Sequence, residues 1–292
     1  MAAIDRLTTQ TDRLSVRRYD DTFDILGTIG TMPKVAALYR YPVKGLTPEP
    51  VRTLAVLPGG RVAGDRVLNF RFADAPVGDT EWCRKYHGVV LANTPGLAQL
   101  KVSLDESARR LVMRRGEDVL ADETLDDEGR SRLASALTSY VLSLPENPLR
   151  GQPQRLPIKL VGDAVSPRYQ DNESGQVTLH SRASVESAGA AFDDAEHDER
   201  RYRHNIVIDD SEAWEEQGWV GRRLRVGAVV FETIVPKVRC LATHANPTSG
   251  ERDLSVMQLL MQKFDQRQPT FGVGMLSAAG GMIHVGDPVS LV

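Results

Sequence analysis

Residues 228–243 read AVVFETIVPKVRCLAT and contain Cys240, one of only two cysteines in the 292-residue chain. The apolar first half of this stretch predicts a β-strand over residues 228–235. Pro236 is expected to end the strand, because proline has no N–H for the hydrogen-bond ladder. Cys240 then lies just past a strand end, with Arg239 beside it. A guanidinium favours the thiolate, the form that attacks electrophiles and binds soft metals.

The alternative for Cys240 is a structural one. Free cysteines are among the most buried residue types and commonly pack as small hydrophobes. The local sequence leaves both interpretations open, so the rest of the chain has to separate them.

The composition is that of a soluble globular protein, with 41% hydrophobic and 26% charged residues. A formal net charge of −3 argues against a general nucleic-acid or anionic-membrane binder, but it leaves room for a local basic pocket. Cys83 and Cys240 lie far apart and in no CxxC spacing. This argues against a disulfide framework and against a cysteine-bound zinc or iron–sulfur site. We expect a cytoplasmic protein with no membrane span and no secretory signal.

The hydrophobic pattern predicts an α+β, β-rich fold built from short strands, of the kind found in β-barrels and sandwiches. A proline-rich connector over residues 145–157 marks the expected seam between two halves. We therefore divide the chain into an N-terminal extension (residues 1–32), a barrel-like domain (33–150) and a second domain (151–292). Strands are expected over residues 35–41, 50–57, 67–72, 100–104, 110–114, 156–161, 177–180 and 206–208, and residues 282–292 are expected to form a strand, a Gly-Asp-Pro turn and a closing strand. Helices are expected over residues 126–144 and 254–264 and from Ser181 onward. The charged run over residues 193–201 is interpreted as a solvated loop or helix face.

Three basic residues stand at the mouths of expected strands. Lys44 follows YPV, Arg66 follows Gly64-Asp65, and Arg203 precedes the strand beginning at Ile206. Cations in such places suit an anionic ligand, although a surface cation at a strand end is more often simply solvated. No GxxxxGK[ST], GxGxxG or GxSxG motif is present, so the common modes of nucleotide binding and serine hydrolysis are not supported.

The C-terminal part of the chain, residues 203–292, resembles the MOSC domain, named for the C-terminal part of molybdenum-cofactor sulfurases. Upstream, YPVK at residues 41–44 and GDR at residues 64–66 look like the β-barrel domain that precedes MOSC in the mitochondrial amidoxime-reducing component and its bacterial relatives. The matching C-terminal pieces are RHNIVI (203–208), WVGRRLRVG (219–227), VRCLATHANPTSG (238–250), FG (271–272) and VGDPV (285–289).

This resemblance implies a β-barrel-like N-terminal domain, a MOSC β-barrel with flanking helices, and a molybdenum cofactor (molybdopterin) held between the two halves. The cofactor is a pterin with a dithiolene pair and a terminal phosphate. In the family, the cysteine of the Arg-Cys pair ligates molybdenum, which makes Cys240 the catalytic and metal-binding residue here. The residues that match cofactor-binding positions, or lie beside them, are Lys44, Gly45, Arg66, Ser181, Arg182, Arg203, Asn205 and Arg239.

The activity implied is that of a molybdenum oxidoreductase that reduces N-hydroxylated small molecules, such as amidoximes and hydroxylamines. Electrons would come from a separate protein, either a heme protein or a flavin or iron–sulfur protein. No nucleic acid is expected as a partner. Two alternatives stay open. One is a carrier that delivers sulfur or cofactor through a persulfide at Cys240, and the other is a protein that kept the fold and lost the cofactor.

The sequence departs from the family pattern at four positions. Gly45 stands where Ser is frequent, His204 where Pro is frequent, and Asn246 where Asp is usual. Gly274 replaces an aromatic residue of the amidoxime reducers. These departures bear on the substrate pocket and on the exact reaction, and those at Gly45, His204 and Gly274 add weight to the alternative of a protein that lost the cofactor.

Overall fold

The computed structural model describes residues 32–194 and 196–292. The expected extension at residues 1–32 lies outside the described residues except for Met32. The helices are α1 (Asp127–Ser143), α2 (Arg182–Ala191) and α3 (Val256–Lys263). The strands are β1 (Lys34–Arg40), β2 (Glu49–Val51), β3 (Thr53–Leu57), β4 (Arg61–Val62), β5 (Asn69–Arg71), β6 (Leu100–Asp105), β7 (Arg110–Arg115), β8 (Asp118–Thr124), β9 (Lys159–Val161), β10 (Val177–Ser181), β11 (Ile206–Asp209), β12 (Arg223–Val226), β13 (Val229–Val238), β14 (Thr270–Leu276), β15 (Gly281–His284) and β16 (Val289–Leu291).

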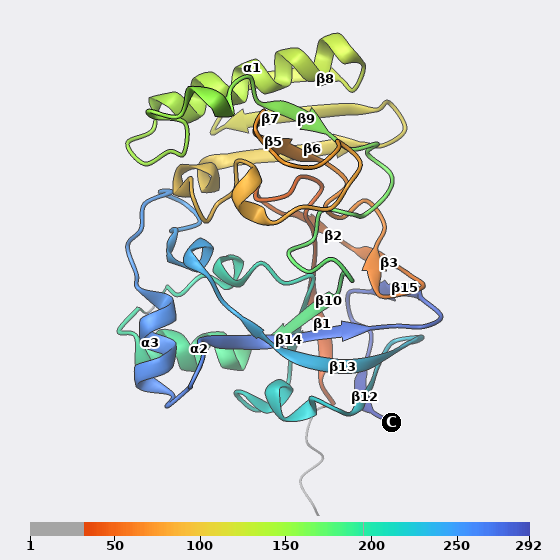
Figure 1. The fold of residues 1–292 in the computed structure, drawn as a ribbon. Helices are drawn as coiled ribbons and strands as arrows, with labels where there is room; N and C mark the ends of the chain where they lie inside the picture. Colours follow the sequence, from red (N-terminus) through yellow and green to blue (C-terminus); the bar gives the residue numbers. More distant parts are fainter. Residues whose placement is uncertain (1–31, 195) are drawn as a thin grey trace, which may run out of the picture. The chain divides into compact units, whose positions relative to one another are not determined.

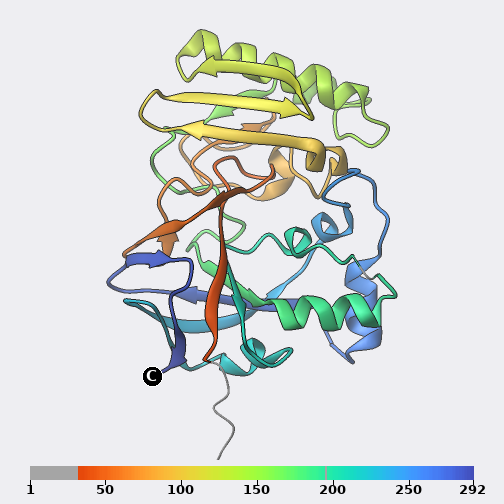
Figure 2. The ribbon, with the colours of Figure 1, turned by 180° about the vertical axis from the view of Figure 1, so that it is seen from behind.

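The largest sheet has eight strands in the order β16-β12-β13-β14-β10-β11-β1-β2. Its pairs are antiparallel except for β10 and β11, which run parallel. A parallel pair needs a long crossover connection, and α2 lies in the segment that joins β10 to β11. Figure 1 shows α2 and α3 beside this sheet. From behind, β1 is seen running through the same layer (Figure 2).

Strand β13 does not end at Pro236 but continues to Val238, so the expected strand end was wrong. The reason lies in the pairing. The register pairs with β12 end at Glu232, and the register with β14 shifts on both sides of Pro236. A proline without an N–H is tolerated where a strand is paired on one side and bulged.

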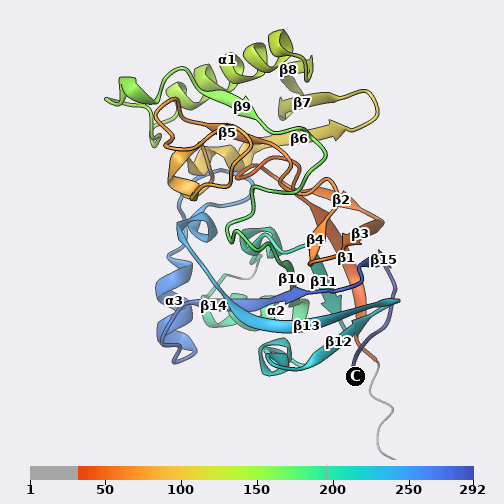
Figure 3. The ribbon, with the colours of Figure 1, turned by 45° about the vertical axis from the view of Figure 1, so that its right-hand side comes forward.

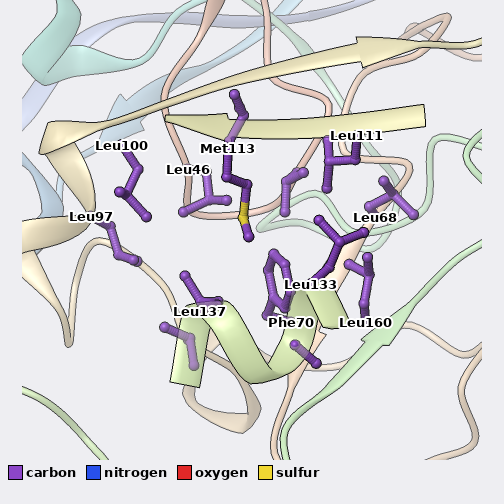
Figure 4. Close-up of a cluster of buried hydrophobic side chains, with 14 of the residues drawn as sticks. Leu46, Leu68, Phe70, Leu97, Leu100, Leu111, Met113, Leu133, Leu137 and Leu160 are labelled. Atoms are coloured by element: carbon purple, nitrogen blue, oxygen red, sulfur yellow. The ribbon is translucent and has the colours of Figure 1, made fainter. Parts of the chain in front are cut away.

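The second group of elements is a three-stranded meander, β6-β7-β8, covered by α1. Strand β6 alternates buried and exposed residues, and its buried face packs with Leu133 and Leu137 of α1. Figure 4 shows these leucines facing Leu111 and Met113 within the buried cluster. Helix α1 starts where expected, because the Asp126 carboxylate accepts a hydrogen bond from the N–H of Gly129 at its first turn.

Strands from the first part of the chain complete the core of the C-terminal sheet. Val35 and Leu38 of β1 and Leu54 of β3 belong to the same buried cluster as Phe231 and Val273. Conversely, β9, which follows the proline-rich connector, pairs with β5 in the other group (Figure 3). The boundary at residues 150/151 stays a prediction. Each of the two groups of strands therefore contains segments from both the first and the second part of the chain.

The expected α+β, β-rich class is confirmed. Closure of either sheet into a barrel stays a prediction. In the part of the chain that the structure describes, no helix is long and apolar enough to cross a membrane.

Candidate functional site

A single pocket gathers Cys240 with most of the cations singled out in the sequence. Its volume is about 880 Å³, part of it open to solvent. Seven Lys or Arg residues and one acid, Asp171, are among the described residues that line it. The seven cations are Lys44, Arg66, Lys85, Arg201, Arg203, Lys237 and Arg239. Such an excess of positive charge in a half-enclosed cleft favours an anionic ligand.

Cys240 lies directly after β13 and before a 3-10 turn at Leu241–His244. Its carbonyl accepts hydrogen bonds from the N–H and the hydroxyl of Thr243, both at 3.0 Å. The side chain is half-buried and lines the pocket. The thiol is therefore open to a ligand, which disfavours the purely structural interpretation of this cysteine.

Lys85 lies next to Cys240. Burial opposes its charge, but the negative charge of Cys240 and of Asp171, with a hydrogen bond to the sulfur, raises the pKa of Lys85. The 3-10 turn Lys85–His87 brings this side chain into the lining of the pocket. The pair links the sulfur to a permanent positive charge at neutral pH.

Two arginines are held against the same aromatic ring. The guanidinium carbons of Arg66 and Arg203 lie 4.4 and 4.5 Å from the ring centroid of the buried Tyr41. Arg66 pairs with Asp65, and Arg203 donates to the carbonyl of Leu46 at 2.7 Å. Both arginines have a left-handed backbone, with φ of 51° and 56°. Such backbone strain in a non-glycine residue persists where the surrounding structure enforces it, and it is common at functional sites.

Lys44 is 3% exposed, and its Nζ donates to the carbonyl of Gln170 at 3.2 Å. Burial lowers the pKa of Lys44, and the nearby charge of Asp171 acts in the opposite direction. Gly45 is required by the next turn, since φ is +81° and a Cβ would stand 2.6 Å from Cα of Val90. The frequent Ser of the family therefore has no room here without a shift of the backbone.

Arg239 is fixed by three acceptors. It donates to the carbonyls of Lys237 at 2.9 Å and Tyr202 at 2.7 Å, and to Nε2 of His204 at 3.2 Å. His204 is 1% exposed and its Nδ1 lies 2.8 Å from Nδ1 of His180. Burial, together with the charge of Arg239, lowers the pKa of His180 to about 3 and that of His204 well below its ordinary value. Two neutral histidines therefore stand behind this arginine.

Three of the expected cofactor-binding residues do not line the pocket. Ser181 is fully buried and caps α2 by accepting from the N–H of Ser184. Arg182 forms ion pairs with Glu199 and Asp209. Asn205 is also fully buried, but it acts on the pocket indirectly. Its Nδ2 lies 3.3 Å from Oδ1 of Asp65, the partner of Arg66.

The sequence analysis missed three of the cations, Lys85, Arg201 and Lys237. Arg201 falls in the run interpreted as solvated, but it is 3% exposed and pairs with Asp253 at 2.7 Å. That interpretation was wrong for Arg201 and for His197, whose side chain is 2% exposed. Lys237 belongs to the same motif as Cys240, so the sequence could have predicted it as a site residue. No signal in the sequence singles out Lys85.

Comparison with known proteins finds a matching family model for the C-terminal part of the chain. Residues 166–290 match a family model described as "MOSC domain". The chain contains a MOSC domain. The matched range includes β10–β16 and Cys240, and the upstream likeness to the amidoxime-reducing component rests on the short motifs alone. No curated protein gives a significant match to the chain.

Solved structures are similar to this MOSC-containing chain only at a low level. YiiM from Geobacillus stearothermophilus has 13% identity and a TM-score of 0.29, over 40% of this chain and 53% of YiiM. The chain thus spans about half the length of YiiM. The YuaD protein from Bacillus subtilis has 8% identity and a TM-score of 0.39, over 88% of this chain and 94% of YuaD. A hypothetical protein has 17% identity and a TM-score of 0.33, over 44% of this chain and 56% of its own.

Proposed function

We propose that the protein binds a molybdenum cofactor in this pocket and is an oxidoreductase that reduces N-hydroxylated compounds. One observation carries the proposal. The half-buried sulfur of Cys240 opens onto a pocket lined by seven cations and one acid within the described residues. A soft thiolate suits molybdenum, and guanidinium and ammonium groups suit a phosphate.

The residues present fit such a group. Arg66 and Arg203, strained and held against Tyr41, offer guanidinium N–H donors to a phosphate. Lys44 adds a buried ammonium, and Arg239 stands beside the sulfur. Among the described residues, no group of three or more His, Cys, Asp or Glu side chains is arranged to hold a metal ion. In this proposal Cys240 is the protein ligand and the pterin dithiolene supplies the other sulfur atoms.

When bound, the molybdenum cofactor supplies two-electron transfer and accepts oxygen from a substrate. The protein holds the cofactor, orients the substrate beside Cys240 and limits access of water. Overall, the N–O bond of the substrate breaks and an N–H bond forms. Two electrons and two protons are consumed and the oxygen leaves as water. The electrons come from a separate heme protein or from a flavin or iron–sulfur protein.

The metal content of the protein tests the proposal. The chain is produced in a host that makes the cofactor, and molybdenum is measured by elemental analysis. We expect close to one molybdenum per chain in the wild type and a strong loss in Cys240→Ala. Cys83→Ala is the matched control, because Cys83 is buried and does not line the pocket. Full molybdenum in Cys240→Ala would falsify the ligand role.

The carrier alternative depends on the same sulfur. Cys240 is reachable from the pocket and has the ammonium of Lys85 beside it, an environment that also suits a persulfide. A sulfur adduct on Cys240 in the mass spectrum, with no reduction of benzamidoxime by reduced donor proteins, favours this alternative over the enzyme.

A further inference from the structure

Two lysines of the pocket differ from its other five cations. The other five donate to carboxylates or to backbone carbonyl oxygens of the protein. Lys85 and Lys237 form no ion pair within 4.0 Å in the part of the chain that the structure describes. An ammonium has three N–H donors. Lys85 contacts the sulfur of Cys240, and Lys237 donates to Oε1 of Gln176 at 2.8 Å.

Lys237 occupies space that a glycine leaves open. A Cβ on Gly274 would stand 2.9 Å from Cδ of Lys237 and 2.4 Å from Oε1 of Gln176. Gly274 is the position at which the amidoxime reducers carry an aromatic residue. An aromatic side chain here would displace the Lys237–Gln176 pair. In this chain, the ammonium of Lys237 and the amide of Gln176 therefore line the pocket instead.

Both lysines line the pocket together with Cys240. Lys85 lines the pocket with Cys240 and interacts with its sulfur. Lys237 is three residues before Cys240, so the α-carbons of Lys237 and Cys240 are at most about 10 Å apart. A substrate has to approach the metal-binding sulfur, whereas Arg66 and Arg203 offer their donors from other loops. The donors of Lys85 and Lys237 that have no carboxylate or backbone partner are therefore available to a substrate bound in the pocket beside Cys240.

We propose that Lys85 and Lys237 bind a carboxylate of the substrate, so that the substrate class is N-hydroxylated compounds that carry a carboxylate. This inference rests on the proposed function. Two ammonium groups with spare donors, both lining one half-enclosed pocket, give charge-assisted hydrogen bonds to such a group. An uncharged amidoxime of the same size gains none of them.

Calorimetric binding titrations test the inference without turnover. The molybdenum-loaded protein is titrated with 4-carboxybenzamidoxime and with benzamidoxime, in the absence of an electron donor. We expect the wild type to bind the carboxylate probe more tightly. Lys237→Met should weaken that probe by roughly tenfold and leave the neutral probe unchanged, and Lys85→Met should weaken the carboxylate probe by roughly tenfold more than it weakens the neutral one. Lys263→Met, an exposed lysine at the end of α3, is the control and should change neither.

Other results of the same titrations would contradict the inference. Equal affinity of the wild type for the two probes, or an equal loss for both in each variant, overturns the inference. Loss of molybdenum from Lys85→Met and Lys237→Met, with the carboxylate preference intact, also overturns it and assigns the lysines to the cofactor. If the wild type contains no molybdenum, the proposed function fails, and the same titrations on the metal-free protein still decide the carboxylate site. Lys237→Arg, which keeps the charge, should retain the preference.

Discussion

The Nδ1 atoms of His180 and His204 lie 2.8 Å apart, and each of these histidines is 1% exposed. Arg239, which contacts the other ring nitrogen of His204, fixes the tautomers of both histidines. Arg239 can only donate, so Nε2 of His204 is the acceptor at 3.2 Å and Nδ1 of His204 carries the proton. His180 then accepts at Nδ1 and carries its own proton at Nε2, an atom with no partner among the described residues. Both imidazoles are neutral in the folded protein.

This pair predicts an acid-sensitive fold. The pKa of His180 falls to about 3 because of burial, followed by the charges of Arg239 and Arg182. The folded state therefore disfavours the proton that the unfolded chain takes up below its ordinary pKa near 6.5. The contribution of the pair to stability is complete above pH 6.5 and is lost as the pH falls toward about 3, by up to about 1.4 kcal/mol per pH unit for one histidine.

Urea unfolding at several pH values between 7 and 4.5 checks this prediction. The wild type should lose stability over this range, and His180→Leu should show a shallower slope. Asp163 titrates below this window, because hydrogen bonds from Ser166 and Val165 and the charge of Arg168 outweigh the opposing effect of burial and lower its pKa to about 2. Parallel slopes in the wild type and His180→Leu would contradict a neutral buried pair.

The strained backbone of Arg203 predicts that stability and cofactor binding can be separated. Its φ is 56°, which glycine adopts freely and alanine does not. Arg203→Gly and Arg203→Ala both remove the guanidinium, so both should lose most of the molybdenum. Arg203→Gly should be more stable than Arg203→Ala by about 1 kcal/mol, measured by urea unfolding. Equal stabilities would mean that the left-handed conformation costs nothing here.

Much of the site could be predicted from short motifs, because the motifs fall where strands end. Lys44 and Arg203 stand next to strands that the hydrophobic pattern of the sequence predicts. Their side chains line one pocket with Cys240. The helices α1 and α3 were predicted for a similar reason, since their apolar residues recur with helical spacing. In these cases, local pattern and tertiary structure agree.

The remainder depends on contacts between distant parts of the chain. Lys85 has no motif, and only the folded chain brings it into one pocket with Cys240, which is 155 residues away in the sequence. The charged run around Arg201 looks solvated in sequence, yet its partner Asp253 lies 52 residues away. Pro236 was misjudged because one-sided pairing and a bulge, neither visible in the sequence, make room for it.

The core beneath α1 gives a stability prediction that is independent of the site. Leu137 is fully buried between α1 and the meander (Figure 4). Leu137→Ala should lower the free energy of unfolding by about 2–5 kcal/mol through lost burial and the cavity left behind. Urea unfolding measures the loss. Leu142→Ala, at an exposed position of the same helix, is the control and should cost far less.

The proposed carboxylate site predicts a pH dependence of binding on the alkaline side. Burial, followed by the charge of Arg239, lowers the pKa of Lys237 to about 8, while Asp171 opposes and Arg66 adds to the effect. Lys237 therefore loses its positive charge as the pH rises through about 8. Affinity for 4-carboxybenzamidoxime should fall between pH 7 and 9.5, and that for benzamidoxime should not. Lys237→Arg, whose charge does not titrate in this range, should remove most of the fall.

Gly274 offers a way to reverse the substrate preference. In Gly274→Phe, the new side chain would take the space of the Lys237–Gln176 pair, because even a Cβ at this position meets both side chains closely. The variant should lose roughly tenfold in affinity for the carboxylate probe and bind benzamidoxime at least as well as the wild type, by stacking and burial of the ring. Gly218→Ala is the control, since nothing lies within 4 Å of a Cβ there. Molybdenum content should stay unchanged in both variants, so a preference for the carboxylate that survives Gly274→Phe would show that Lys237 is not the residue that recognises it.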